Sequence, residues 1–262
     1  MTPSLPGDLA RRIGEARAIV AFTGAGVSAE SGVPTFRGTD GIWSKLKPEE
    51  LASMNAFMKN PSMVWQWYAH RKKIMSGISP NPGHHALATM ESLAPSFAVI
   101  TQNIDGLHRR AGSRRVFELH GNIERNYCMK CGTPYGSDFE VAPSSLPLCP
   151  SCGGLVRPDV VWFGEMLPEE EWNASVRAAE GADLFMSVGT SAVVYPAASL
   201  PLVAKRSGAY LLEINPEPTP LTPQADQFLR GPSGILLPLL AEAMEEFRRA
   251  PPLTDMKGTG TP

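Results

Sequence analysis

Short apolar runs recur along the chain, and each of them ends at a small or polar residue. The runs that have the length of a β-strand are residues 18–22, 97–100, 116–119, 184–188 and 210–214. Segments with a helical pattern lie between them, at residues 83–92, 168–180 and 195–207. Continuous apolar strands are typical of a parallel sheet that helices cover on both faces. The alternation therefore predicts an α/β fold with a Rossmann-like, doubly wound parallel sheet.

Two segments interrupt this alternation. Residues 43–80 have a helical pattern with many aromatic side chains, and residues 126–157 are rich in Pro, Gly and Cys. We predict that both belong to a smaller lobe inserted into the main domain, which then consists of the ranges 8–42, 81–125 and 158–249. Residues 250–262 are rich in Pro, Gly and Thr, and we predict a flexible tail there.

The charge balance of the chain is close to neutral. Lys and Arg total 24 against 26 Asp and Glu, which gives a net charge of -2. This balance offers no electrostatic basis for binding nucleic acid or an anionic membrane. The N-terminus lacks the apolar segment of a secretory signal, and no apolar run approaches the roughly 20 residues that span a bilayer. We therefore expect a cytoplasmic protein with neither nucleic acid nor membrane as a partner.

The four cysteines lie in one short stretch, as Cys128-x2-Cys131 and Cys149-x2-Cys152 with 17 residues between the pairs. This spacing is typical of a zinc site. Four thiolates close the coordination shell and leave no position for water, so we expect a single structural zinc ion. Zinc ribbons also occur in nucleic-acid binders, but the neutral charge balance disfavours that alternative.

A glycine-rich turn follows the first predicted strand. Gly24-Ala25-Gly26-Val27-Ser28-Ala29 fits the pattern G-x-G-x-x-(G/A) of dinucleotide-binding turns, although an ordinary turn can carry the same residues. In a dehydrogenase, a strand ending in an acidic residue follows about 20 residues later. Here the chain continues instead as a polar loop, 30–38, which contains Phe36 and Arg37 and which we expect to cover a bound nucleotide.

Several motifs together resemble the sirtuin family. They are the stretches 24–38 and 101–108, the pair His120-Gly121, the four cysteines, and residues 163–165, 189–191 and 215–217. They occur in the family's order and span about residues 8–245. The resemblance implies an NAD-dependent protein-lysine deacylase that consumes NAD and yields nicotinamide, free lysine and O-acyl-ADP-ribose. His120 would be the general base, a task that suits an imidazole because it titrates near neutral pH.

The resemblance also implies which residues contact NAD. Asn103 and Asp105 would line the nicotinamide pocket, and Ser191 and Asn215 would hold the adenosine ribose. The full set of implied NAD contacts is Gly24, Ala25, Gly26, Ala29, Glu30, Thr35, Phe36, Arg37, Trp43, Gln102, Asn103, Ile104, Asp105, Gly189, Thr190, Ser191, Asn215, Pro216, Glu217 and Ser233. Taken singly, His120, Asn103 or Asp105 could equally be a capping or turn residue.

The acylated lysine of a protein or peptide substrate is expected between the two lobes. The segment Val160, Val161, Trp162, Phe163 and Gly164 could pair with the substrate backbone as an added strand. Tyr68 and Arg71 are spaced i and i+3, so on a helix they share one face, where a guanidinium and a phenol can bind a carboxylate. This pair and Ala52, which widens the acyl pocket, resemble the sirtuin class that removes succinyl, malonyl or glutaryl groups. The alternative is a solvated basic face, because Arg71 begins a run of three basic residues.

We therefore predict a monomeric deacylase that removes succinyl or malonyl groups and also acetyl groups. Two alternatives remain open. One is a mono-ADP-ribosyltransferase, in which Tyr68 and Arg71 would have no purpose. The other is a zinc-containing nucleotide-binding interaction module without catalysis, which the intact Asn103, Asp105 and His120 disfavour.

Overall fold

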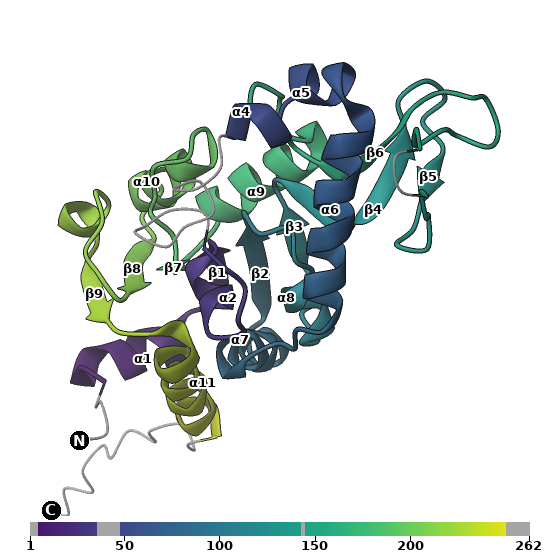
Figure 1. The fold of residues 1–262 in the computed structure, drawn as a ribbon. Coiled ribbons are helices and arrows are strands. Elements are labelled where there is room, and N and C mark those ends of the chain that lie inside the picture. The colour runs from purple at the N-terminus through teal and green to yellow at the C-terminus, as the bar shows by residue number, and fades with distance from the viewer. Residues whose placement is uncertain (1–4, 36–47, 143–144, 250–262) are drawn as a thin grey trace, which may run out of the picture.

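The computed structural model describes residues 5–35, 48–142 and 145–249, and its centre is a parallel sheet of six strands (Figure 1). The order in the sheet is β3-β2-β1-β7-β8-β9, which is the Rossmann order. The strands are β1 Ala18–Thr23, β2 Ser96–Thr101, β3 Val116–Glu118, β7 Leu184–Val188, β8 Tyr210–Asn215 and β9 Gln227–Arg230. The predicted fold class is confirmed, and β9 is a strand that the apolar pattern did not show.

Successive residues of the strands enter two different cores, because side chains alternate across a sheet. Ile19 and Ala21 belong to the core on one face, whereas Val20 and Phe22 belong to the core on the other. The first face is covered by α1 (Gly7–Glu15), α7 (Pro82–Leu93) and α11 (Ser233–Arg249), and the second by α9 (Glu169–Glu180) and α10 (Leu200–Arg206). Both faces of the sheet are therefore buried, as the continuous apolar runs predict.

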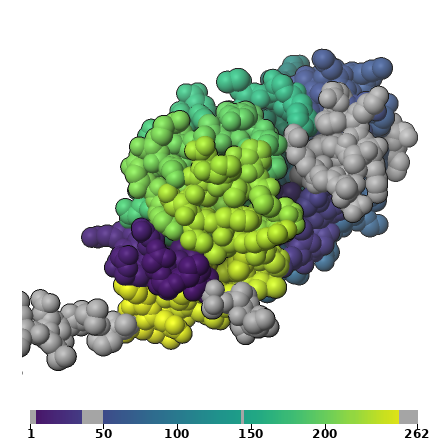
Figure 2. Space-filling view, turned by 90° about the vertical axis from the view of Figure 1, so that its left-hand side faces the viewer, coloured from purple at the N-terminus to yellow at the C-terminus, as the bar shows by residue number. Residues whose placement is uncertain are grey.

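The first and last helices of the described chain pack against each other (Figure 2). Gly14 of α1 allows this packing, because a Cβ at this position would lie 2.2 Å from the ring of Phe247 in α11. Helix α11 also contains Pro238, a residue that disfavours a helix interior, yet Leu237 and Leu240 beside it are fully buried in the core. This helix is a second element that we did not predict.

A second, antiparallel sheet lies beside the first and has the order β5-β4-β6, in which β4 is Gly121–Cys128, β5 is Pro134–Tyr135 and β6 is Val156–Val160. It therefore includes residues 121–125 and 158–160, which the sequence pattern had assigned to the main domain. The pattern gives no boundary there, because β4 follows β3 after two residues. Helix α6 (Pro61–Ser76) packs on β4 and β6 of this sheet (Figure 1). Two short helices, α4 (Pro48–Leu51) and α5 (Met54–Lys59), precede it in the chain.

No helix in the described ranges has both the length and the apolar composition needed to cross a bilayer. Four short helices complete the described structure: α2 (Gly26–Ala29), α8 (Leu107–Arg110) and the 3-10 helices η1 (Ala197–Ser199) and η2 (Thr222–Gln224).

Candidate active site

A cavity of about 720 Å³ opens beyond the carboxyl ends of β1, β2, β7 and β8. Ligands of open α/β sheets bind at this edge, where the strand order reverses. Of the residues that we expected to contact NAD, the cavity is lined by Gly24, Ala25, Gly26, Ala29, Thr35, Gln102, Asn103, Ile104, Gly189, Thr190, Ser191, Asn215, Pro216 and Glu217. It is also lined by His120 and by all the residues expected to bind the acyl-lysine: Ala52, Tyr68, Arg71, Val160, Val161, Trp162, Phe163 and Gly164. The sequence thus predicted residues that the fold brings together, and their individual roles stay predictions.

The glycine turn at the floor of the cavity packs against the loop that follows β7. The backbone N–H of Gly26 donates to the carbonyl of Gly189 over 2.8 Å. A Cβ at Gly26 would lie 2.7 Å from that carbonyl oxygen, and a Cβ at Gly189 would lie 2.4 Å from the backbone nitrogen of Val27. These glycines are therefore required by the close approach of two backbones, and this approach leaves a floor without side chains along the cavity.

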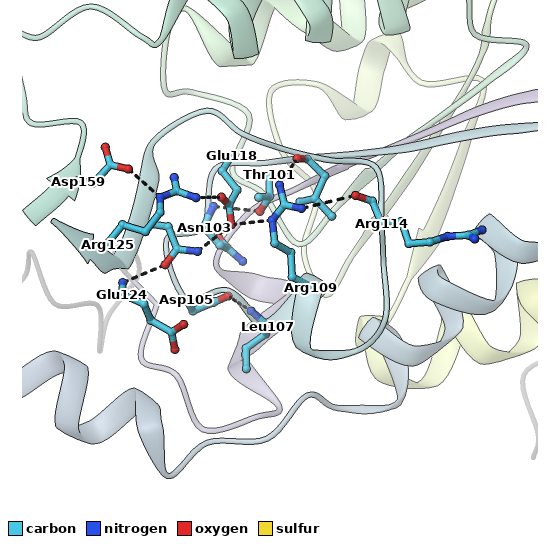
Figure 3. A network of polar contacts seen from close by, with 12 residues as sticks. Thr101, Asn103, Asp105, Leu107, Arg109, Arg114, Glu118, Glu124, Arg125 and Asp159 are labelled. Carbon is cyan, nitrogen blue, oxygen red and sulfur yellow. Dashed lines mark hydrogen bonds and ion pairs between the residues drawn. The ribbon is translucent and has the colours of Figure 1, made fainter. Parts of the chain in front are cut away.

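Asn103 and Asp105 orient the same turn from the end of β2. The Asn103 amide donates to the carbonyl of Gly24 over 3.0 Å, and the Asp105 carboxylate accepts the hydroxyl of Ser28 over 2.7 Å. Asp105 also accepts the N–H of Leu107 over 2.9 Å (Figure 3). Burial raises the pKa of Asp105, and these donors oppose that shift. Asp105 does not line the main cavity but a much smaller one beside it, together with Asn103 and Arg71.

Two buried histidines, His84 and His108, lie beneath the turn and were given no role by the sequence analysis. Nε2 of His84 lies 3.4 Å from the Ser28 hydroxyl, and Nε2 of His108 lies 2.9 Å from the Thr23 hydroxyl. Their ring centres are 4.9 Å apart. Burial lowers the pKa of His84 to about 4. Burial also holds the pKa of His108 well below its ordinary value of 6.5, so both rings are neutral at pH 7. The motif 101–108 includes His108, but no sequence pattern pairs it with His84, and only the packing of α7 against α8 shows this pair.

His120 follows β3 and faces the cavity. Its Nδ1 lies 2.9 Å from the carbonyl oxygen of Gln102. Because a carbonyl can only accept, the proton of the neutral ring is on Nδ1, and Nε2 keeps a lone pair. Burial lowers the pKa of His120, while the bond to Gln102 raises it. The imidazole is therefore held in the tautomer that can accept a proton at Nε2, as a general base requires.

The connection that carries His120 is fixed by a buried carboxylate, Glu118, which is 4% exposed. Its oxygens pair with Arg125 at 2.7 Å and with Arg109 at 3.5 Å, and they accept the amide of Asn122 over 2.8 Å (Figure 3). Arg125 also pairs with Asp159 of β6 at 2.8 Å. This network joins the end of β3 to both long strands of the second sheet and so restrains the segment between the two sheets.

Two of the expected NAD contacts, Glu30 and Ser233, meet each other outside the set of residues that line the cavity. The Glu30 carboxylate accepts the N–H of Gly234 over 2.6 Å and the Ser233 hydroxyl over 3.3 Å. A carboxylate is favourable at this place because the first turn of α11 has free N–H groups and the positive end of the helix dipole. Phe36, Arg37 and Trp43 lie outside the described residues.

Tyr68 and Arg71 share the face of α6 that borders the cavity, as their spacing predicts. Tyr68 is 2% exposed and Arg71 is 7% exposed, so the alternative of a solvated basic face is wrong for this pair. Ala52 accepts a backbone hydrogen bond from Phe163 over 3.0 Å, and Val161 donates to the carbonyl of His120 over 3.0 Å. These two hydrogen bonds connect the segment 160–164 both to Ala52 and to His120.

The four cysteines form a cluster at one end of the second sheet. Their sulfur atoms all lie within 4.8 Å of one another, with 3.5 Å between Cys128 and Cys152 and 3.8 Å between Cys131 and Cys149. A tetrahedral zinc ion with Zn–S bonds of about 2.3 Å places its sulfurs about 3.8 Å apart. The residues therefore fit one zinc ion with a closed shell, and the ion would join the β4–β5 turn to the segment before β6.

The fold and the cavity together define a dinucleotide-binding α/β protein with a zinc-binding lobe. A model of the Sir2 family matches residues 24–196. NAD-dependent protein deacylase 2 of Pyrobaculum aerophilum is 52% identical over 242 residues, which cover 92% of this chain and 97% of that protein. NAD-dependent protein deacylase of Pyrococcus abyssi is 50% identical over 247 residues, which cover 92% of this chain and 98% of that protein. The chain therefore belongs to the Sir2 family, and the sirtuin resemblance is confirmed.

Solved structures agree with this assignment. A Sir2 homologue in complex with NAD superposes with a TM-score of 0.87 at 47% identity, covering 93% of this chain and 95% of that one. A Sir2 variant bound to a deacetylated p53 peptide and 3'-O-acetyl ADP-ribose superposes with a TM-score of 0.79 at 36% identity, covering 91% of this chain and 96% of that one.

Proposed function

We propose that this Sir2 protein is an NAD-dependent protein deacylase that transfers the acyl group of a modified lysine to the ADP-ribose part of NAD. The products would be nicotinamide, free lysine and O-acyl-ADP-ribose. The observation that carries the proposal is the cavity itself, which joins a backbone floor suited to a dinucleotide, the Nε2 lone pair of His120 and an apolar segment at 160–164. The names of the relatives and the ligands of the solved structures support the same reaction.

In this mechanism the protein would orient NAD and the substrate peptide and would supply one proton acceptor. The turn at Gly24–Gly26 would hold the pyrophosphate, because backbone N–H groups at a helix start favour anions. Asn103 is fixed by its bond to Gly24 and would orient the nicotinamide amide. Nε2 of His120 would take the proton of a ribose hydroxyl as that oxygen attacks the acyl carbon. The substrate peptide would lie along residues 160–164 as an added strand.

We further propose that the enzyme prefers acyl groups that end in a carboxylate, such as succinyl or malonyl, and also removes acetyl groups. Arg71 supports this preference, because it places a guanidinium in the wall of the acyl-lysine side of the cavity. Its neighbours there are the Trp67 ring, 4.9 Å from the guanidinium carbon, and the Tyr68 phenol. A guanidinium can bind a carboxylate through two parallel hydrogen bonds.

The test is a side-by-side measurement of kcat/KM for one peptide carrying acetyl, malonyl, succinyl or glutaryl lysine, with nicotinamide release as the readout. A higher value for the acids than for acetyl is the expected result. Release from acetyl alone would remove the acidic-acyl proposal and leave the deacylase proposal intact. No release from any of the four peptides would overturn both.

A further inference from the structure

The Tyr68 hydroxyl has a single hydrogen-bond partner among the described residues, the indole of Trp162. Nε1 of Trp162 lies 2.9 Å from the Tyr68 oxygen, and each side chain is 2% exposed. An indole N–H can only donate, so the phenol oxygen is the acceptor. The hydroxyl therefore keeps its own proton for another acceptor. Burial raises the pKa of Tyr68 to about 12, which keeps this proton in place at neutral pH.

Trp162 itself is held on several sides. The guanidinium carbon of Arg157 lies 3.5 Å from the centre of the indole ring, and the ring of Phe57 lies 5.2 Å away on α5. The backbone N–H of Trp162 donates to the Glu165 carboxylate over 2.7 Å, and that carboxylate pairs with Arg157 over 2.9 Å. The indole therefore has little freedom to rotate, and the direction of its N–H is fixed.

We infer that Trp162 is a positioning residue for acyl specificity, which acts by occupying the oxygen of Tyr68 and leaving the phenol proton for the carboxylate of an acidic acyl group. Tyr68 and Arg71 both line the cavity on the acyl-lysine side, so one carboxylate can accept from the phenol and the guanidinium together. An acetyl group has no such acceptor and gains nothing from this arrangement. The inference rests on the proposed preference for acidic acyl groups.

The experiment compares succinyl and acetyl peptides with wild type, Trp162→Phe, Tyr68→Phe and the double variant. The readout is the ratio of kcat/KM for succinyl over acetyl, because Trp162 lies in the cavity wall and its loss can lower both rates. Trp162→Phe should lower this ratio by about 2- to 12-fold, mainly through KM for the succinyl peptide, as expected for one hydrogen bond. The ratio of the double variant should equal that of Tyr68→Phe. Trp172→Phe, an indole on α9 outside the cavity lining, is the control and should keep the wild-type ratio.

A further fall of the ratio when Trp162→Phe is added to Tyr68→Phe would show that the indole does not act through the phenol. An unchanged ratio in Trp162→Phe would also overturn the inference, while succinyl removal by the wild type would still support the proposed function. Wild type that removes acetyl but no succinyl group would overturn the inference and the proposed acidic-acyl preference, and would leave the deacylase proposal intact.

A second measurement does not depend on the folding of Trp162→Phe. In protein labelled with ¹⁵N at its five tryptophans, Tyr68→Phe should shift one indole N–H signal and speed its exchange with solvent. Five unchanged signals would refute the bond on which the inference depends.

Discussion

The two sides of the cavity differ in the chemistry of the side chains that line them. On the side of the large sheet, the side chains of Asn103 and His120 are each hydrogen-bonded to a backbone carbonyl. On the side of α6 and residues 160–164, the lining is largely apolar and aromatic, with Arg71 and Tyr68 as its polar contribution together with Glu165. Under the proposed function, the first side would orient the reaction, whereas the second would discriminate among acyl groups. Variants on the first side should affect every acyl substrate alike, and variants on the second should change their ratio.

The largest effect is expected at His120. Replacing it with alanine removes the Nε2 acceptor and should lower kcat for succinyl and acetyl peptides alike, by about 100- to 10 000-fold. Single-turnover assays with both peptides would measure this loss. A loss confined to one acyl group would contradict the division between the two sides. His70, on the exposed part of α6, provides a control by His70→Ala.

Removal of the zinc site should have the next largest effect, on stability and through it on activity. Cys128→Ala leaves three ligands, and metal binding to such sites is coupled to folding of the surrounding segment. We expect less than one zinc per chain by metal analysis and a melting temperature lower by roughly 10 °C, which corresponds to a few kcal/mol for a chain of this size. Ser151→Ala, in the turn between the second pair of cysteines, is the matched control. A wild-type protein without zinc would refute the assignment.

Arg71→Met should change selectivity more than overall rate. The lost charge-assisted contact is worth about 1.5–3 kcal/mol, so the ratio of succinyl to acetyl kcat/KM should fall by roughly 10- to 150-fold. Lys73→Met removes the same charge from an exposed position of the same helix and should leave the ratio as in wild type. If both peptides lose activity equally in Arg71→Met, Arg71 has no part in acyl recognition.

The smallest effect concerns the pH profile of kcat/KM, whose acidic limb should have its midpoint below the ordinary pKa of a histidine. His120 must be neutral to accept a proton, so activity is lost as pH falls through its pKa. Because burial lowers that pKa from 6.5, the limb should have its midpoint below pH 6.5 and a plateau above it. The limb should be the same for kcat/KM of acetyl and succinyl peptides, since His120 belongs to the side common to both. Limbs with different midpoints would argue that another group controls the rate.

Elements with a strong local signal could be predicted from the sequence. The strands β1, β2, β7 and β8 are continuous apolar runs, and the spacing of the cysteines is sufficient for a cluster. Strand β9 was missed because Gln227–Arg230 has only four residues and a polar residue at each end. Strand β4 was missed because polar residues interrupt its apolar ones.

Contacts between distant segments could not be predicted. Glu30 meets Ser233 across 203 residues, and Trp162 meets Tyr68 across 94. No local pattern encodes either contact, because each depends on how two helices or loops are placed by the whole fold. The i, i+3 spacing of Tyr68 and Arg71 did predict their shared face, since that relation is internal to one helix.

The contact between Gly26 and Gly189 also limits how this cavity could be redesigned. Any side chain at either position would collide with backbone rather than with a movable side chain, so a substitution there would force the two loops apart. A programme of directed evolution toward bulkier acyl groups would therefore find few tolerated changes on the floor. Productive libraries should instead randomise Ala52 and Trp67, whose side chains line the cavity and can change volume without moving the main chain.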